Sequence, residues 1–227
     1  MTLATVGVTA IPIRTSVVRP GDDLVEIVAR AAGGIARAGD VVAVSETALA
    51  IAQGEFVVAE HIRPSRLAYV LSRRAHPMAT ISQPESLQLV IDRVGSLKVV
   101  YATILQLVAR CFGRRGVFYE VMGDAVAAFD GYTGTMPPYE RAIVLSPRDP
   151  QGFARAVRAQ TGIECAVVDA NDLGRAKVLG CSDAVDRECV EAALLANPHG
   201  NSDEQTPIVV LKWRGRGANP LTRGAAA

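Results

Sequence analysis

The hydrophobic residues of this chain follow two alternating patterns, short apolar runs typical of strands and a three-to-four-residue spacing typical of helices. Together these patterns predict a layered arrangement of strands and helices. Short apolar runs that end in polar turns predict strands at residues 5–12, 41–44, 117–121, 142–145, 164–168 and 208–213. Apolar residues spaced three and four apart predict helices at residues 24–38, 64–74, 85–95, 97–111, 152–161 and 184–195. The alternation of the two element types favours an α/β or α+β layered fold. The sequence shows no internal repeat and no interdomain linker, so we expect a single domain over residues 1–213. Residues 214–227 are small, basic and aperiodic, which predicts a flexible tail.

The most informative stretch is residues 165–174, CAVVDANDLG, in which a buried strand ends abruptly in acids and amides. A carboxylate at the end of a buried strand faces a crevice, where α/β proteins place their ligands. Asp169, Asn171 and Asp172 carry hard oxygen donors of the kind that bind Mg²⁺ or Mn²⁺. The alternative is a strand-to-helix connection in which these side chains cap the next helix.

Three further acidic clusters lie at the ends of apolar runs or in polar loops. Glu46 follows the strand at residues 41–44, where it is a candidate metal or substrate ligand, unless its neighbours Ser45 or Thr47 only cap a helix. Asp130 ends the apolar run at residues 125–129, and Asp203 and Glu204 lie in a polar loop. Several carboxylates and amides are what divalent metals and a phosphorylated ligand require.

Arginines offer the matching positive charge. Arg114 and Arg115, in the segment FGRRG, are candidates for contacting phosphate oxygens, although an exposed turn explains the same residues. The segment lacks the GxxxxGK[ST] pattern of a P-loop. Arg63, Arg66, Arg73 and Arg74 form a second basic group, for which a solvated helix face is the alternative interpretation.

Composition narrows the function classes. The formal net charge of +1 argues against binding nucleic acid by bulk charge, and no apolar run approaches the ~20 residues of a membrane span. The N-terminus lacks the basic region of a signal peptide, and the four cysteines have no CxxC spacing. We therefore expect a cytoplasmic protein with buried free thiols. There is no GxSxG motif, and His199 is interpreted as a loop residue.

The order of these motifs resembles the coenzyme F420-0:γ-glutamyl ligase family. The resemblance covers residues 39–213 and rests on the ordered set Gly39-Asp40 with its strand, Gln53-Gly54, Asp130-Gly131, Asp149-Pro150 and the strand ending at Asp169, followed by Leu173-Gly174-Arg175.

The resemblance implies an α/β fold with a mixed sheet, assembled as an intertwined homodimer. It implies a GTP- or ATP-dependent ligase that uses Mg²⁺ or Mn²⁺ to activate a carboxylate as an acyl phosphate for attack by an amine. Asp130 and Asp169 would hold the metals with help from Asp172, Asp203 and Glu204, and Glu46 would assist catalysis. Arg114, Arg115, Asn171 and Gly174 would contact the nucleotide.

The partners implied are small-molecule carboxylates and amines, with no nucleic acid and no membrane. The segment after the first family strand reads ETALAI at residues 46–51 and lacks the two lysines typical of the family. That difference leaves a second hypothesis open, a non-catalytic homologue that binds a nucleotide or metabolite.

Overall fold

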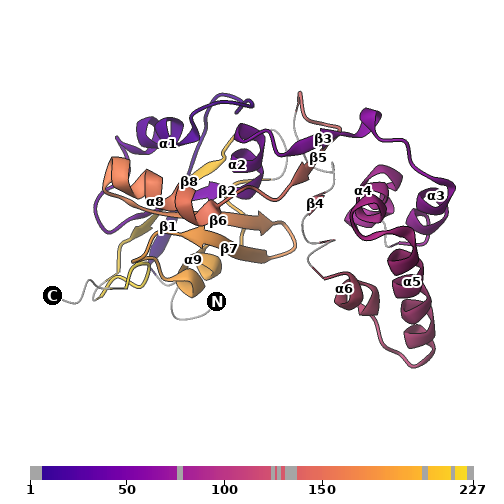
Figure 1. Ribbon diagram of the computed structural model, residues 1–227. Coiled ribbons are helices and arrows are strands. Elements are labelled where there is room, and N and C mark those ends of the chain that lie inside the picture. The colour runs from indigo at the N-terminus through magenta and orange to yellow at the C-terminus, as the bar shows by residue number, and fades with distance from the viewer. Residues whose placement is uncertain are drawn as a thin grey trace. The chain divides into compact units, whose positions relative to one another are not determined.

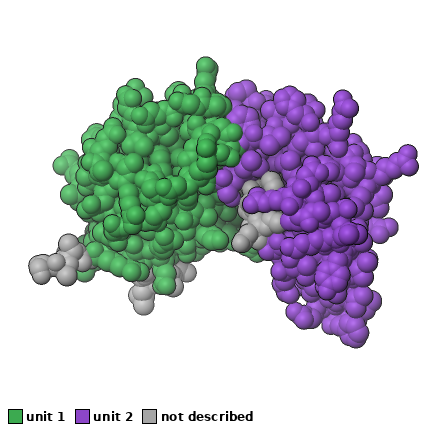
Figure 2. Space-filling view, in the orientation of Figure 1, with its two compact units in different colours: residues 1–55, 147–227 green, residues 56–146 purple. Residues whose placement is uncertain are grey.

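The computed structural model describes residues 7–75, 79–123, 126, 129–130, 137–200, 204–215 and 218–223. The chain divides into unit 1, formed by residues 1–55 and 147–227, and unit 2, formed by residues 56–146 (Figure 2). We expected one domain over residues 1–213 from the sequence, whereas the contacts between residues gather in these two units. Each unit is described by itself below.

Unit 1 is built on a mixed five-stranded sheet with the order β1-β8-β2-β6-β7 (Figure 1). The strands are β1 (Val8–Ile13), β2 (Val41–Ser45), β6 (Glu164–Asn171), β7 (Arg175–Cys181) and β8 (Ile208–Trp213). β2 and β6 pair in parallel, and the other neighbouring strands pair antiparallel. The mixed sheet agrees with the fold class expected from the sequence.

Helices cover both faces of this sheet, which explains why the central strands are continuous apolar runs. The helices are α1 (Leu24–Ala32), α2 (Glu46–Ala52), α8 (Pro150–Thr161) and α9 (Arg187–Ala193). Val190 of α9 shares a buried cluster with Val41 and Val209, while α8 packs on β6 and β7 and against α1.

Local capping fixes the first turn of two of these helices. The Asp23 side chain accepts a hydrogen bond from the Glu26 amide at 3.1 Å, and the Asp149 side chain accepts one from the Gly152 amide at 2.8 Å. Both starts agree with the sequence prediction. The helix expected at residues 24–38 is shorter, because it ends before Gly33.

Unit 2 combines a three-stranded sheet, of order β3-β5-β4, with several helices. Its strands are β3 (Phe56–Val58), β4 (Phe129–Asp130) and β5 (Ala142–Leu145). Its helical segments are η2 (Ala59–His61), α3 (Arg66–Ser72), η3 (Thr80–Ser82), α4 (Pro84–Val94), α5 (Ser96–Cys111) and α6 (Val117–Met122). A separate core joins Leu87, Val90, Val99 and Phe118.

The strand predicted at residues 117–121 is wrong, because this segment is helix α6. Phe118 and Met122, four residues apart, are both buried, which is a helical spacing. Gly116 starts the helix with a left-handed φ of +87°, which a glycine adopts without strain. A mostly apolar segment of six residues fits either a strand or a helix, so the sequence could not separate the two.

The helix predicted at residues 97–111 is present as α5. Its length and apolar spacing also predicted a buried helix, and that prediction is wrong. Only Val99 and Ala102 are buried along its length. Its outer face leaves Leu97, Tyr101, Ile104 and Val108 exposed, with Leu97 at 85%. The inner face packs on α4 and α6, and a helix needs only one apolar stripe for such packing.

The structure differs from the sequence prediction at two further places in the C-terminal part of unit 1. The sequence did not predict β7, which returns antiparallel to β6 as the second strand of a hairpin. The flexible tail expected from Arg214 is instead anchored over residues 218–223. There Leu221 is fully buried and Thr222 forms a β-bridge with Val185.

No single helix among the described residues is long and apolar enough to cross a membrane. By length and composition alone, α4 and α5 pass that test only as a pair, bent by 114°.

Candidate functional site

The carboxyl ends of the two parallel strands of unit 1 lie side by side. Ser45 at the end of β2 pairs with Val168 of β6. The residue that follows each of these two is an acid: Glu46, at the start of α2, follows Ser45, and Asp169 of β6 follows Val168. The structure therefore brings two of the predicted site residues to neighbouring positions at one edge of the sheet, the edge where α/β folds place ligands.

Asp169 does not end its strand, as the sequence suggested, because β6 continues to Asn171. It lies opposite Lys177 of β7 in the antiparallel pairing. The side chain is on the exposed side of the strand, yet desolvation by the surrounding protein raises the pKa of its carboxyl, and the Lys177 ammonium acts in the opposite direction. Lys177 thus helps to keep Asp169 ionised and able to hold a cation.

The turn after Asp169 is a β-hairpin, which corrects the alternative of a helix cap. The Asn171 side-chain oxygen accepts a hydrogen bond from the Leu173 amide at 3.1 Å, an Asx turn. Gly174 has a left-handed φ of +71°, and its amide donates to the Asn171 carbonyl at 3.2 Å. Both predicted nucleotide contacts, Asn171 and Gly174, therefore have a local role in shaping this turn.

Asp172 at the tip of the hairpin is tied to a distant loop. The amide nitrogen of the buried Asn197 side chain donates to Asp172 Oδ1 at 2.7 Å. The polar loop that follows contains Glu204, whose side chain lies against Gly200. Asp203, predicted as a ligand in the same loop, lies outside the described residues. The structure brings Asp172 to this loop, and only one of its two carboxylate oxygens, Oδ1, accepts the hydrogen bond from Asn197.

His199 in the same loop is buried, and its imidazole is neutral at physiological pH. Its Nδ1 lies 3.1 Å from the Thr206 carbonyl, and the Thr206 hydroxyl donates back to the His199 carbonyl at 2.5 Å. Burial lowers the pKa of His199 to about 4. These bonds hold the loop together, in agreement with the interpretation of His199 as a loop residue.

The carboxylates of unit 1 could bind Mg²⁺ or Mn²⁺ only if a ligand's phosphates and water supplied most of the coordination. Among the residues that the structure describes, no three His, Cys, Asp or Glu side chains cluster as a closed metal cage. Mg²⁺ binds proteins through one or two carboxylates when substrate phosphates and waters supply the other ligands. Asp169 fits that role. Asp130 belongs to unit 2, where its backbone forms β4 with β5, and its side chain is outside the described part of the chain.

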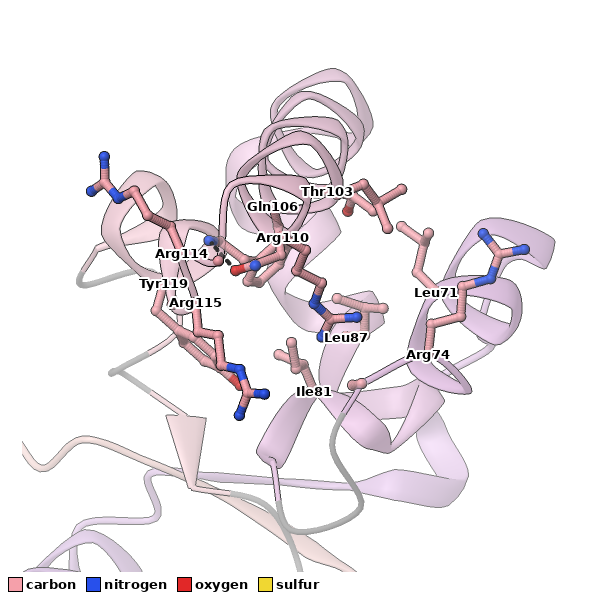
Figure 3. A pocket seen from close by; sticks show the side chains of 15 residues that line it. Leu71, Arg74, Ile81, Leu87, Thr103, Gln106, Arg110, Arg114, Arg115 and Tyr119 are labelled. Carbon is pink, nitrogen blue, oxygen red and sulfur yellow. Dashed lines mark hydrogen bonds between the residues drawn. The ribbon is translucent and has the colours of Figure 1, made fainter.

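The other two predicted contacts, Arg114 and Arg115, line a pocket of about 660 Å³ within unit 2 (Figure 3). The pocket lies between α3, α4, α5 and α6 and the loop that joins α5 to α6. Among the described residues that line it, four are arginines and none is an acid; the arginines are Arg74, Arg110, Arg114 and Arg115. Its apolar lining includes Leu71, Ile81, Leu87, Leu107 and Phe118. The sequence prediction of a basic loop is thereby extended to a basic cavity.

Arg114 differs from the other arginines of the pocket. Its guanidinium forms an exposed ion pair with Glu120 at 3.4 Å, and in Figure 3 it points away from Arg110 and Arg115. Gln106 on the pocket wall accepts a hydrogen bond from the Phe118 amide at 3.2 Å. Its Nε2 is buried without a hydrogen-bond partner among the described residues.

Sequence reasoning missed Lys177, Gln106 and Arg110 as site residues. Lys177 lies in β7, a strand that was not predicted, so its pairing with Asp169 could not be inferred from the sequence. Arg110 lies in the last turn of α5, and Arg114 lies in the loop just after that helix, so their short separation in the sequence would have placed both near one end of α5. Gln106 is one turn earlier on the same helix. Its role depends on the fold of α6, which was predicted as a strand.

The sequence predicted buried free thiols, and the structure confirms this prediction in part. All four cysteines are free; Cys165 and Cys181 are buried, but Cys111 is exposed. Burial, with the nearby Cys181 and Glu164 adding to it, raises the pKa of the Cys165 thiol far above its ordinary value. Cys165 is therefore a core residue of β6, with no accessible thiolate for chemistry.

Comparison with known proteins gives the same family as the sequence pattern. Residues 12–184 match the family model described as F420-0:Gamma-glutamyl ligase. A curated relative, the coenzyme F420:L-glutamate ligase of Methanopyrus kandleri, is 29% identical over 177 residues, which make up 76% of this chain. The chain spans 62% of the length of that relative. The matched region includes Glu46, Asp130 and Asp169.

Proposed function

The chain belongs to the F420-0:gamma-glutamyl ligase family, and on that basis we propose that it is a carboxylate–amine ligase. In the proposed reaction a nucleoside triphosphate, GTP or ATP, transfers its terminal phosphoryl group to a carboxylate. The nitrogen of an amino acid or another amine then attacks the acyl phosphate, an amide bond forms and inorganic phosphate leaves. The relative from Methanopyrus kandleri carries the name of such a ligase.

The observation that carries this proposal is the position of Asp169 beside Glu46. Both acids follow paired residues of neighbouring parallel strands, so rigid backbone holds them at one sheet edge. Phosphoryl transfer requires little covalent chemistry from a protein, but it requires fixed charges around the phosphate oxygens. A carboxylate pair at a sheet edge supplies such fixed positions.

The proposed roles follow from the charges of the side chains. Asp169 would hold Mg²⁺ or Mn²⁺, which neutralises charge on the phosphate oxygens, and Asp130, Asp172, Asp203 and Glu204 are the further proposed ligands. Glu46 would orient the carboxylate or amine substrate. Arg114 and Arg115 would stabilise phosphate oxygens, and Asn171 and Gly174 would keep the hairpin in place for the nucleotide.

We also propose that the protein acts as a homodimer on small molecules, without nucleic acid or membrane. Support comes from the outer face of α5, where Leu97, Tyr101, Ile104 and Val108 form an exposed apolar stripe. Contiguous apolar surface of this kind marks an interaction site in soluble proteins, and a second copy would bury it.

A second candidate is a homologue that binds a nucleotide or metabolite without turnover. It is favoured by α2, whose sequence ETALAIA places no lysine in the segment after β2. Five of its seven residues are buried, so this helix serves the core more than a phosphate site.

Product formation tests the two candidates. The purified chain is incubated with GTP or ATP, Mn²⁺ and mixtures of carboxylic acids and amino acids, and phosphate release and product masses are measured. We expect phosphate release that requires both an acid and an amine, together with a product whose mass equals the two less one water. Tight nucleotide binding with no release would favour the second candidate and contradict the ligase.

A further inference from the structure

The pocket of unit 2 combines positive charge with an apolar interior. Residues 56–146 contain ten Lys and Arg against seven Asp and Glu, a formal charge of +3. Four of the ten basic residues line this one pocket, whereas none of the acids that the structure describes in this unit does so. All four arginines are exposed, so solvent screens much of their mutual repulsion, but together they create a positive potential at this pocket. That potential favours a bound anion.

Three of the four arginines have no acidic partner within the part of the chain that the structure describes. Arg114 alone forms an ion pair, with Glu120. The guanidinium groups of Arg74, Arg110 and Arg115 form neither an ion pair nor a hydrogen bond with any described residue. In Figure 3 the side chains of Arg110 and Arg115 extend over the space above Ile81 and Leu87. Their donors are therefore available to an oxyanion.

The interior of the pocket requires more than a bare anion. Ile81, Leu87 and Phe118 are buried around it, and Leu107 adds an exposed apolar wall. The volume of about 660 Å³ falls within the range of cavities that hold small organic ligands. An inorganic phosphate would neutralise the arginines but leave this apolar surface in contact with water.

Gln106 adds a directional group to the wall. Its Oε1 is occupied by the Phe118 amide, while its Nε2 is buried without a partner among the described residues. A buried donor that lacks a hydrogen bond costs free energy, and a ligand oxygen would satisfy it. The donor lies on the helix that also carries Arg110 and Leu107.

We propose that this pocket binds an organic phosphate, a ligand with a phosphate group at one end and an apolar ring or chain at the other. Arg110 and Arg115 would bind the phosphate, Gln106 a further oxygen, and the apolar lining the body of the ligand. Arg74 also lines the pocket, but its guanidinium points away from Arg110 and Arg115 in Figure 3, so it would add only to the positive potential. A phosphate monoester carries up to two negative charges and suits a pair of guanidinium groups better than a single carboxylate does. The inference deepens the proposed ligase, for which it supplies the binding site of one phosphate-bearing reactant.

Binding of matched probes tests this inference. Isothermal titration calorimetry with the full chain would compare 1-naphthyl phosphate, 1-naphthol and inorganic phosphate, in the absence of metal and nucleotide. We expect 1-naphthyl phosphate to bind at least tenfold more tightly than either of its halves, with an affinity that falls as NaCl rises. Equal affinity for 1-naphthyl phosphate and 1-naphthol would overturn the proposal.

Variants locate the binding. Arg110→Gln and Arg115→Gln should each weaken 1-naphthyl phosphate about tenfold or more, because each removes a charge-assisted hydrogen bond. Arg66→Gln is the control, since Arg66 is an exposed arginine of α3 that does not line the pocket. Unchanged affinity in both pocket variants, with circular dichroism showing the native fold, would also overturn the proposal.

Competition identifies the source of the phosphate. Displacement of 1-naphthyl phosphate by GTP or ATP would assign the pocket to the nucleotide. Binding without displacement would assign it to a different phosphate-bearing reactant, and either outcome supports the site. These binding experiments measure no turnover, so they are independent of the product-formation experiment. A protein that binds the probe but forms no amide would contradict the proposed ligase and still support the proposed binding site.

Discussion

Asp169 lies directly opposite Lys177 across the β6–β7 hairpin of unit 1. Desolvation raises the pKa of the Asp169 carboxyl, and the Lys177 ammonium counteracts this effect. The pair thus sets the pH range in which Asp169 is ionised and able to hold a divalent metal. Two residues that are eight positions apart in the sequence control one charge at the sheet edge.

Lys177→Met should narrow the pH range of activity from the acidic side. Removal of the ammonium raises the pKa of Asp169 further, so the carboxylate becomes protonated at a higher pH than in the wild type. Substrate-dependent phosphate release should then fall more at pH 6 than at pH 8. Lys177→Arg, which keeps the positive charge, should retain the wild-type profile. Identical profiles for the Met variant and the wild type would contradict a role for this pair.

Asp172→Ala should destabilise unit 1 by about 1 kcal/mol, because it removes the 2.7 Å hydrogen bond from Asn197. Urea unfolding followed by circular dichroism measures this change. Asp172→Asn keeps an acceptor oxygen at the same position and should restore most of the stability. If Asp172 also binds metal, the Asn variant would weaken Mn²⁺ binding although its stability is normal, and this result would separate the two roles.

His199 should make the protein less stable at acidic pH. Its folded-state pKa of about 4 lies below the ordinary value of 6.5, so the unfolded chain takes up a proton first as the pH falls. Stability is therefore full above pH 6.5 and declines between pH 6.5 and pH 4, by roughly 3 kcal/mol for a shift of this size. His199→Asn keeps a side-chain donor near Thr206 but cannot titrate. The difference between variant and wild type across this range measures the contribution, and parallel stability curves would contradict it.

Ile104→Glu should disrupt the proposed homodimer. The substitution places a charge in the middle of the exposed apolar stripe of α5, where burial against a second copy would then be unfavourable. Light scattering should show a dimer for the wild type and a monomer for the variant. Lys98→Glu places the same residue at a position of α5 that is already exposed and charged, and should leave the dimer intact. A monomeric wild type would exclude the proposal.

Local signals in the sequence were sufficient for most elements. The helices predicted to begin at residues 24 and 152 are present as α1 and α8, and Asp23 and Asp149 cap their first turns. Such starts can be read locally, because a cap needs only its own helix turn. The strands β5 and β8 have the predicted bounds, since each is a short apolar run between polar turns.

Tertiary contacts explain what the sequence did not reveal. α6 is a helix because Phe118 and Met122 face one core, and α5 has an exposed face because only one side packs. Of the candidate site, the sequence identified Asp169 and Glu46 individually, but their proximity follows from the parallel pairing of β2 with β6. The unit 2 pocket joins Arg74 to Arg110 and Arg115 from separate helices and a loop, and local patterns carry no such pairing.

Asp169→Asn is the most direct test of the proposed ligase. The measurement is nucleotide-dependent phosphate release, in the presence of Mn²⁺, an acid and an amine, by the wild type, by this variant and by Asp183→Asn. Asp183 is an acid of the same unit whose side chain is 79% exposed and pairs with Arg155, so its variant controls for a lost surface charge. We expect the Asp169 variant to keep its fold and lose turnover, while the Asp183 variant retains it. Full turnover in the Asp169 variant would contradict the metal role of Asp169.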